Sequence, residues 1–393
     1  MFPYVYILVL AFSSFILTDI FKYKSLNNIL VFGIFVSFVL IAGFRYRVGG
    51  DSLAYYDLYD NFPSIDKLSS LALFERGYGP FWYLLCAIAK LISPDFFVLQ
   101  FLEAVVINSS VIHIFYKYSK NICSCLLIYT IFYFIYFNME IMREALAVSI
   151  FLWNIDNLIK KRYLKYYFGC FIAIGFHLSA VITLLIPLLL LFFYKIKSFE
   201  FIIFFVFCLF ILLLYLIKNR FDIFGFLPPF LKIKIHSAGT KGFFNLKGTI
   251  NNMLPFFSFY LPFFIFNRVN KENKQKTVMF SCFLLFLFLG GINYSFSRFS
   301  NYFIVFAITY FVNNTVALSK ASVKHNFSIV SFLLCLILFS FNILTLHLIF
   351  YYSRDTSDRS MNTRMYQLWV PYESIFSETR HVDREKIFYN ALN

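Results

Sequence analysis

The sequence predicts an all-α polytopic integral membrane protein with about 11–13 membrane helices, some of them short or re-entrant. Of the 393 residues, 60% are hydrophobic and 14% are charged, whereas a soluble domain carries about 25% charged residues. Apolar runs of about 15 to 25 residues recur along the whole chain, and each is long enough to cross a bilayer as a helix. The 28 tyrosines and 58 phenylalanines fit interfacial belts and a packed helix bundle, but they identify no ligand.

The predicted spans recur along the whole chain. They cover residues 4–20, 28–44, 97–115, 122–137, 142–159, 164–176, 178–194, 199–217, 252–267, 277–292, 299–317 and 326–350. The run 4–20 lacks a basic leader and a small-residue cleavage site, so we interpret it as the first span and not as a signal peptide. We expect 1–352 to form one transmembrane helical domain and 353–393 a polar C-terminal tail.

One apolar run, 79–92, is too short for an ordinary span. As a helix it would extend about 21 Å, whereas the hydrocarbon core is roughly 30 Å thick. We therefore expect it to lie re-entrant or interfacial. If it crossed the membrane, every segment before it would be inverted.

Basic residues in short loops orient the spans by the positive-inside rule. If 79–92 does not cross, all of these loops lie inside: Lys22/Lys24, Lys117/Lys120, Lys160 to Lys165, Lys195/Lys197, Arg268 to Lys276, and Lys320/Lys324. The longer polar loops 45–78 and 218–250 then lie outside. The loop 218–250 is basic and so departs from the rule. Two interpretations stay open: it serves an anionic lipid substrate, or a long loop tolerates charge on either side.

Several function classes find no support in the sequence. The net charge of +15 sits largely in the short loops, and no basic domain or RNA-binding motif accompanies it, so we expect no nucleic-acid partner. The seven cysteines lie in or beside apolar spans and are interpreted as buried thiols. No Walker loop, GxSxG, dinucleotide fingerprint or Asp-x-Asp pattern occurs. We predict no cofactor and no metal.

Four arginine-bearing clusters interrupt the apolar sequence. They are GFRYRVGGD (43–51), FERGY (74–78), MEIMREA (139–145) and SFSRFSNY (295–302), and the orientation above places all four on the extracytoplasmic face. Arginine is costly to bring near hydrocarbon, and its guanidinium binds phosphate oxygens in pairs. The pattern predicts an anionic ligand, with phosphate or pyrophosphate as the first candidate.

In the first cluster, Arg45 and Arg47 are followed by two glycines and by Asp51. The glycines allow a tight turn beside two guanidinium groups. The alternative is that both arginines snorkel at the interface. Tyrosines are available for stacking on sugar rings or for an aromatic belt, and the candidates for the sugar-binding role are Tyr55, Tyr56, Tyr78 and Tyr302.

The second and third clusters add carboxylates. Glu75 precedes the run 79–92 and could act as a general base toward a hydroxyl, or belong to a solvated loop. Glu140, Arg143 and Glu144 have the i, i+3, i+4 spacing of one helix face. They form either an intrahelical ion pair or an arrangement in which two acids position Arg143 for a phosphate.

His177 lies within a 29-residue stretch, 166–194, that has no charged group. We interpret this stretch as two short helices that meet near Gly175–His177. An ionisable residue inside a membrane is a functional candidate, although a lone histidine is more often a hydrogen-bonded core group. Arg298 is predicted to begin the span 299–317, where the positive end of the helix dipole suits an anion site.

Taken in order, the motifs resemble those of the EpsG family. The segments that carry the resemblance span roughly residues 40–376 and are RYRVGGDSLAYYDLYD, ERGY, MREALAVSIFLWNI, IAIGFHLSAVITLLIPL, FSRFSNYF and PYESIF. The resemblance implies a Wzy-type polymerase of O-antigen, capsule or exopolysaccharide, an inverting glycosyltransferase of the bacterial inner membrane with an extracytoplasmic site. Its donor and acceptor would be polyprenyl-pyrophosphate-linked oligosaccharides, and a chain-length regulator would be a further partner.

In that chemistry the arginines would stabilise the charge that develops on the leaving pyrophosphate. The candidates are Arg47, Arg143 and Arg298, with Arg45 in support, and Arg143 counts as catalytic. The base for the acceptor hydroxyl is Asp51, Glu75 or His177. Two alternative functions stay open. The first is an O-antigen ligase or other transferase with polyprenyl-linked donors. The second, which the sequence favours less, is a flippase for lipid-linked oligosaccharides.

Overall fold

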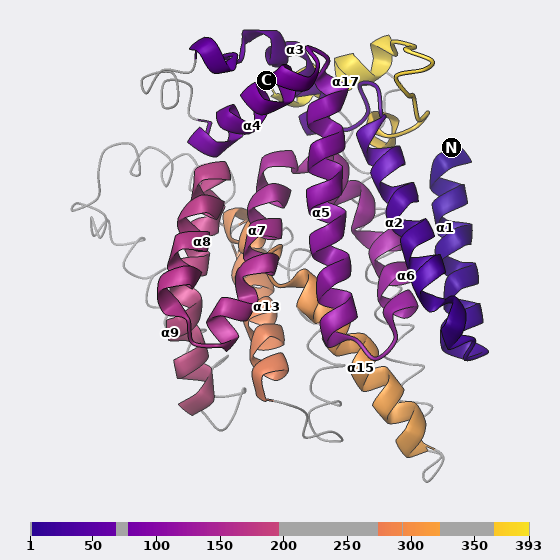
Figure 1. The fold of residues 1–393 in the computed structure, drawn as a ribbon, viewed down its shortest axis with the longest axis vertical. Coiled ribbons are helices and arrows are strands. Elements are labelled where there is room, and N and C mark those ends of the chain that lie inside the picture. The colour runs from indigo at the N-terminus through magenta and orange to yellow at the C-terminus, as the bar shows by residue number, and fades with distance from the viewer. Residues whose placement is uncertain (1, 68–77, 196–273, 293, 323–364, 393) are drawn as a thin grey trace. The chain divides into compact units, whose positions relative to one another are not determined.

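A computed structural model describes residues 2–67, 78–195, 274–292, 294–322 and 365–392. The chain separates into two compact units. Unit 1 comprises Met1–Leu184, Phe311–Ala317 and Ile343–Asn393, and unit 2 comprises Leu185–Tyr310 and Leu318–Asn342. Every regular element in the described ranges is a helix (Figure 1). The predicted all-α membrane fold class is confirmed.

Three helical segments of unit 1 are candidate membrane spans. Helix α1 (Phe2–Phe15) continues into a π-helical turn (Ile16–Ile20), and α2 (Asn27–Gly43) and α5 (Phe96–Tyr118) follow. The segments Phe2–Ile20, Lys24–Gly43 and Phe96–Tyr118 are long and apolar enough to cross a membrane, and six shorter apolar helices occur in the described ranges. The bounds of these three long segments match the predicted spans 4–20, 28–44 and 97–115 to within a few residues.

Four further helices complete the unit 1 bundle. They are α6 (Ile122–Phe132), α7 (Met142–Ile159), α8 (Tyr163–Phe176) and the start of α9 (Ile182–Lys195). A π-helical turn, η5 (Tyr136–Glu140), joins α6 to α7, and a 3₁₀ turn, η6 (Leu178–Val181), joins α8 to α9. The predicted break near Gly175–His177 is confirmed, because α8 ends at Phe176 and His177 has an extended backbone.

Two short helices, α3 (Gly50–Leu58) and α4 (Pro80–Ile92), lie at the end of the bundle where α2 ends (Figure 1). The residue before α4, Gly79, touches the carbonyl of Gly175 at the end of α8 so closely that a Cβ would not fit. The other end of α4 connects within a few residues to the first turn of α5. Both ends of α4 therefore lie at one end of the bundle, as predicted for a segment that does not cross.

The C-terminal tail folds back onto this same end. Its described part contains η7 (Met365–Leu368) and α17 (Val382–Leu392), drawn in yellow in Figure 1. An isolated antiparallel bridge pairs Arg45 with Ser374. The amide of Ile375 donates to the carbonyl of Phe44 at 3.0 Å.

In unit 2, the structure describes α13 (Lys274–Ile292), α14 (Tyr294–Ser300) and part of α15 (Ile304–Ser322). Helix α14 packs back on α13, with Gly290 against the backbone of Ser297. One prediction is wrong here: the span 299–317 starts at Ile304, and Arg298 lies in the last turn of a separate helix. The predicted spans 199–217, 252–267 and 326–350, the loop 218–250 and Glu75 lie outside the described residues.

Candidate functional site

The site is built around the loop 45–51, which joins α2 to α3. Arg47 has φ 51° and Gly49 has φ 96°, both in the left-handed region. A Cβ on Gly49 would lie 2.4 Å from the carbonyl oxygen of Met139, so this position requires glycine for conformation and for space. The Gly-Gly pair in the sequence thus marks a close contact between the loop and the η5 turn.

Arg45 points into the protein. Its side chain is 1% exposed, its Nε donates to the carbonyl of Val48 at 3.2 Å, and its guanidinium also donates to the carbonyl of Ala42. Gln100 on α5 donates to the carbonyl of Arg45 at 3.4 Å. The buried side chain of Glu103 lies one turn beyond Gln100 on α5. Arg45 therefore ties the end of α2 to α5.

Arg47 is held by two carboxylates. Its Nη1 donates to Asp57 Oδ1 at 2.7 Å, and its Nε donates to Glu385 Oε1 at 2.8 Å. The guanidinium also lies 4.9 Å from the ring centre of Tyr56. Burial raises the pKa of Glu385, but the hydrogen bond from Arg380 and the charge of Arg47 outweigh it and leave the pKa below its usual value. The charge of Arg47 is thus balanced within the protein.

Two acids join the loop to the start of α7. Asp51 Oδ2 accepts the amide of Met142, the first residue of α7, at 2.9 Å. Glu140 Oε1 accepts the amide of Gly50 at 2.9 Å and the indole N–H of Trp369. Burial raises the pKa of Glu140 to about 7, against these hydrogen bonds, which lower it. Glu140 and Asp51 therefore hold the loop and the helix start together.

The predicted shared helix face of the third cluster is wrong. Glu140 ends the η5 turn, Ile141 leaves the helical conformation with φ −130°, and α7 begins only at Met142. Glu140 and Arg143 therefore lie on different elements. Glu144 follows Arg143 on α7 and is 3% exposed.

Arg143 differs from the other arginines of the site. Its Nε donates to the hydroxyl of Tyr55 at 2.6 Å. Its guanidinium carbon lies 5.6 Å from the ring centre of Tyr55 and 4.6 Å from that of Tyr78. Within the described ranges, no carboxylate pairs with Arg143, and its two terminal nitrogens have no hydrogen-bond partner. These nitrogens are the groups best able to bind an added anion.

Aromatic side chains pack beside Arg143. Tyr55, which is 4% exposed, packs edge to face with Tyr78 and against Trp82, with ring centres 6.1 and 4.9 Å apart. Phe176, the last residue of α8, packs against the same cluster. The partly exposed Tyr56 stacks edge to face on Tyr46, with ring centres 5.5 Å apart. Tyr55 and Tyr78, the two tyrosines that contact the guanidinium of Arg143, therefore belong to one packed aromatic cluster.

His177 lies in the turn directly after this cluster. Its Nδ1 is 2.7 Å from Ser179 Oγ and accepts the amide of Ser179 at 3.2 Å, so the histidine caps the η6 turn. Arg298 and Tyr302 belong to unit 2, where Arg298 is exposed and Tyr302 is fully buried. The structure thus brings together Asp51, Tyr55, Tyr78 and Arg143.

Sequence reasoning missed the contributions of the tail and of α3. Asp57, Trp369, Arg384 and Glu385 contact the loop 45–51 or its partners, although none stands at a motif spacing. The one available signal was the concentration of charge in the tail. Within the described ranges, no group of three His, Cys, Asp or Glu side chains gathers as a metal site would require.

Comparison with known proteins adds a family to this geometry. Residues 28–374 match the EpsG family, and this range contains the loop 45–51, the start of α7 and the bridge to Ser374. No curated protein and no solved structure matches the chain. The family resemblance read from the motifs is confirmed. The chain belongs to the EpsG family, which is linked to polysaccharide biosynthesis.

Proposed function

We propose that the protein is a polysaccharide repeat-unit polymerase. It transfers a glycan from a polyprenyl-pyrophosphate carrier to a hydroxyl of a second lipid-linked repeat unit. The acceptor oxygen forms a bond to the anomeric carbon with inversion, the bond from that carbon to the pyrophosphate breaks, and polyprenyl pyrophosphate leaves. The hydroxyl proton passes to a base on the protein. Membership in a family linked to polysaccharide biosynthesis supports this chemistry.

The observation that carries the proposal is the state of Arg143. Two of its nitrogens have no partner within the described ranges, while its Nε and its planar face are fixed by Tyr55 and Tyr78. A guanidinium held in this way presents a pair of donors in a fixed direction, which matches two phosphate oxygens. Because it is placed before the reaction, it stabilises the charge of the leaving group without reorganisation.

The other predicted arginines take different parts in the proposal. Arg45 and Arg47 are bound to backbone carbonyls and carboxylates, so they shape the site. Arg298 stays a predicted pyrophosphate-binding residue. Its replacement by Ala, followed by the same measurement of polymer length as for Arg143→Ala, tests this role. Of the four predicted sugar-binding tyrosines, Tyr56 and Tyr78 are partly exposed and remain candidates for contact with a sugar.

Asp51 is the favoured base. Asp51 belongs to the cluster around Arg143. Tyr55 hydrogen-bonds to Arg143 and also interacts electrostatically with Asp51. His177 and Glu75 are the alternatives, and His177 already uses Nδ1 in its turn. Asp51→Asn and His177→Gln separate these roles: loss of polymer in only one of them identifies the base.

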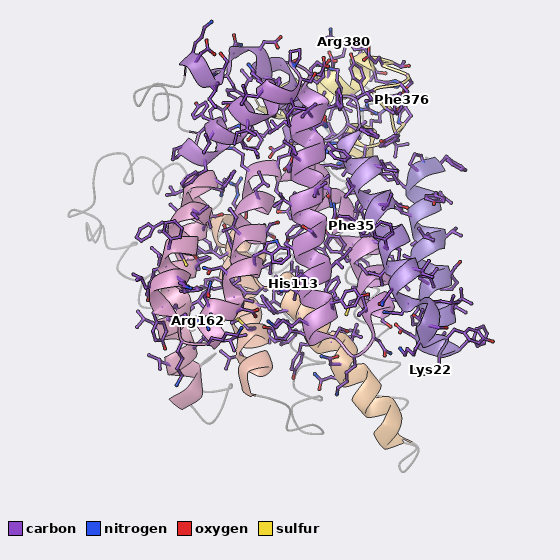
Figure 2. The ribbon with its side chains drawn as sticks, in the orientation of Figure 1. Lys22, Phe35, His113, Arg162, Phe376 and Arg380 are labelled. Carbon is purple, nitrogen blue, oxygen red and sulfur yellow. The ribbon has the colours of Figure 1, made fainter. Side chains whose placement is uncertain are left out.

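We place the site on the extracytoplasmic side. In unit 1 the basic turns that contain Lys22, Lys117, Lys160 and Arg162 lie at the opposite end of the bundle from the loop 45–51. Figure 2 shows this for Lys22 and Arg162 at one end and for Phe376 and Arg380 at the other. The positive-inside rule assigns such short basic turns to the cytoplasm. A lipid-linked repeat unit that has been flipped outward would then meet the site.

The deciding experiment replaces Arg143 by Ala in cells that lack the native gene. We expect single repeat units in place of a polymer ladder on a gel, with unchanged protein in the membrane fraction. Arg143→Lys should restore only part of the ladder, because an ammonium cannot grip two phosphate oxygens in one plane. Arg162→Ala, which removes an exposed arginine at the other end, is the matched control. A wild-type ladder from Arg143→Ala would refute the proposal.

A further inference from the structure

We propose that the C-terminal segment 365–392 is a working part of the site, in which Arg384 is a positioning residue that acts on Arg143 through the loop 45–51. This rests on the proposed function, because it concerns how the anion-binding arginine is held. The family match ends at residue 374, so α17 and Arg384 lie outside it.

The loop 45–51 needs support from outside itself. Arg47 adopts φ 51°, a left-handed conformation that residues other than glycine seldom take, and Gly49 adopts φ 96°. Such conformations persist only where surrounding contacts determine them. The loop's own backbone groups therefore show what holds it.

The tail supplies hydrogen bonds to the loop backbone at three points. Tyr46 N donates to Glu373 O at 2.9 Å, Gly49 N donates to Leu368 O at 3.0 Å, and Arg384 Nη1 donates to Arg47 O at 3.1 Å. The ion pair between Arg47 and Glu385 adds a fourth contact, at 2.8 Å. The unusual residues of the loop are thus the ones that the tail holds.

Arg384 is the centre of these contacts. It is 2% exposed, and its Nε donates to the carbonyl of Gln367 at 2.9 Å. Its guanidinium also donates to the carbonyls of Pro371 and Arg47. The three acceptors come from η7, from the turn after it and from the loop. A planar guanidinium fixes three acceptors in set directions, which the ammonium of lysine does not.

Hydrogen bonds connect the loop 45–51 to the start of α7, where Arg143 lies. Gly50 donates to Glu140, which also accepts the indole N–H of Trp369 in the tail. Asp51 accepts the amide of Met142, and Arg143 is the next residue. A displacement of the loop therefore moves the first turn of α7, from which the guanidinium of Arg143 extends.

If the tail had a purely structural role, a change at Arg384 would alter folding at least as much as ligand binding. The helices of unit 1 also pack on one another directly, for example α7 on α8 and α2 on α5. We therefore expect a change at Arg384 to alter ligand binding more than it alters folding. Affinity and unfolding temperature, measured on the same samples, separate the two roles.

The test uses the purified full-length protein in detergent, with farnesyl pyrophosphate as the probe in a binding titration. We expect Arg384→Gln to weaken binding at least about tenfold, the scale of one lost charge-assisted hydrogen bond. Arg384→Lys should recover only part of the affinity. The unfolding temperature should change by less than about 4 °C. Lys386→Gln, at an exposed residue of α17, is the matched control and should bind as the wild type does.

Wild-type affinity in Arg384→Gln would overturn the inference. If that variant does not accumulate, Trp369→Phe decides, because it removes the indole N–H that contacts Glu140 and keeps an aromatic ring at this position. Undiminished affinity there would also overturn the inference. Arg143→Ala is titrated alongside. If Arg143→Ala binds the probe as the wild type does, the proposed function fails. If Arg143→Ala loses binding while Arg384→Gln keeps it, only the positioning role fails.

Discussion

The two ends of the unit 1 bundle use positive charge in different ways. At the end with the short basic turns, Lys24 pairs with Asp19 at 3.5 Å, and Lys117 pairs with Asp156 with 37% of the lysine side chain exposed. At the end with the candidate site, Arg45 and Arg384 are 1% and 2% exposed and bind backbone carbonyls. The ion pairs cited at the first end are made by exposed or partly exposed lysines, and the buried cations cited at the second end are arginines.

The difference follows from side-chain chemistry. An ammonium on a flexible chain stays hydrated and orients a span without fixing its neighbours. A guanidinium is planar and more weakly hydrated, so it can be buried where several acceptors surround it. Most arginines of the site end therefore hold the protein together, and this leaves Arg143 as the one whose terminal nitrogens lack partners in the described ranges.

Among the variants that test the difference between the two ends, Gly49→Val is expected to have the largest effect on polymer formation and on stability. The substitution places a β-branched side chain at φ 96°, with its Cβ 2.4 Å from the carbonyl of Met139. We expect loss of the polymer ladder and a decrease of roughly 3 kcal/mol in the free energy of unfolding. Gly33→Ala in α2, where no atom lies within 4 Å, should change it by less than about 1 kcal/mol. Normal polymer from Gly49→Val would show that the loop conformation is dispensable.

Next in size is the contrast between Arg47→Ala and Lys117→Ala. Removing Arg47 leaves Asp57 and Glu385 without their charge partner and should cost about 2 kcal/mol of unfolding free energy. Removing Lys117 breaks a partly exposed pair and should cost less than about 1 kcal/mol. Denaturant unfolding in detergent measures both. Equal losses would contradict the difference between the two ends.

The smallest effect is a pH dependence at the site end. Burial raises the pKa of Glu140 from 4.5 to about 7, so the folded state binds a proton there that the unfolded state releases. The resulting stabilisation is complete below about pH 4.5 and is lost as the pH rises through 7. Between pH 6 and pH 8 the loss should be about 1 kcal/mol. Glu140→Gln should flatten this part of the stability curve, and an unchanged slope would speak against the buried state of Glu140.

Much of the fold follows from local properties of the sequence. The long apolar runs predict α1, α2, α5 and α7 closely, because length and composition alone decide whether a helix can span hydrocarbon. The limited length of 79–92 correctly predicted that α4 would not cross the bundle. The break at His177 followed from an uncharged stretch too long for one helix.

The internal geometry of the site could not be predicted in the same way. The i, i+3 spacing suggested that Glu140 and Arg143 share a face, but a π-helical turn separates them. The partners of Arg47 lie 10 and 338 residues away, and no local pattern reports such a pairing. Arginine clusters show where positive charge gathers, but they do not show which guanidinium is already bound.

The dependence of the loop on the tail has a consequence for biosynthesis. Arg47 emerges from the ribosome 338 residues before Glu385. At a synthesis rate of about 5–20 residues per second this interval is on the order of tens of seconds. Arg47 and Gly49 lack their tail contacts throughout that time, although the first helices can already insert. Chains truncated by premature termination would therefore enter the membrane without the tail contacts of the loop 45–51, and we expect such chains to lack the proposed activity.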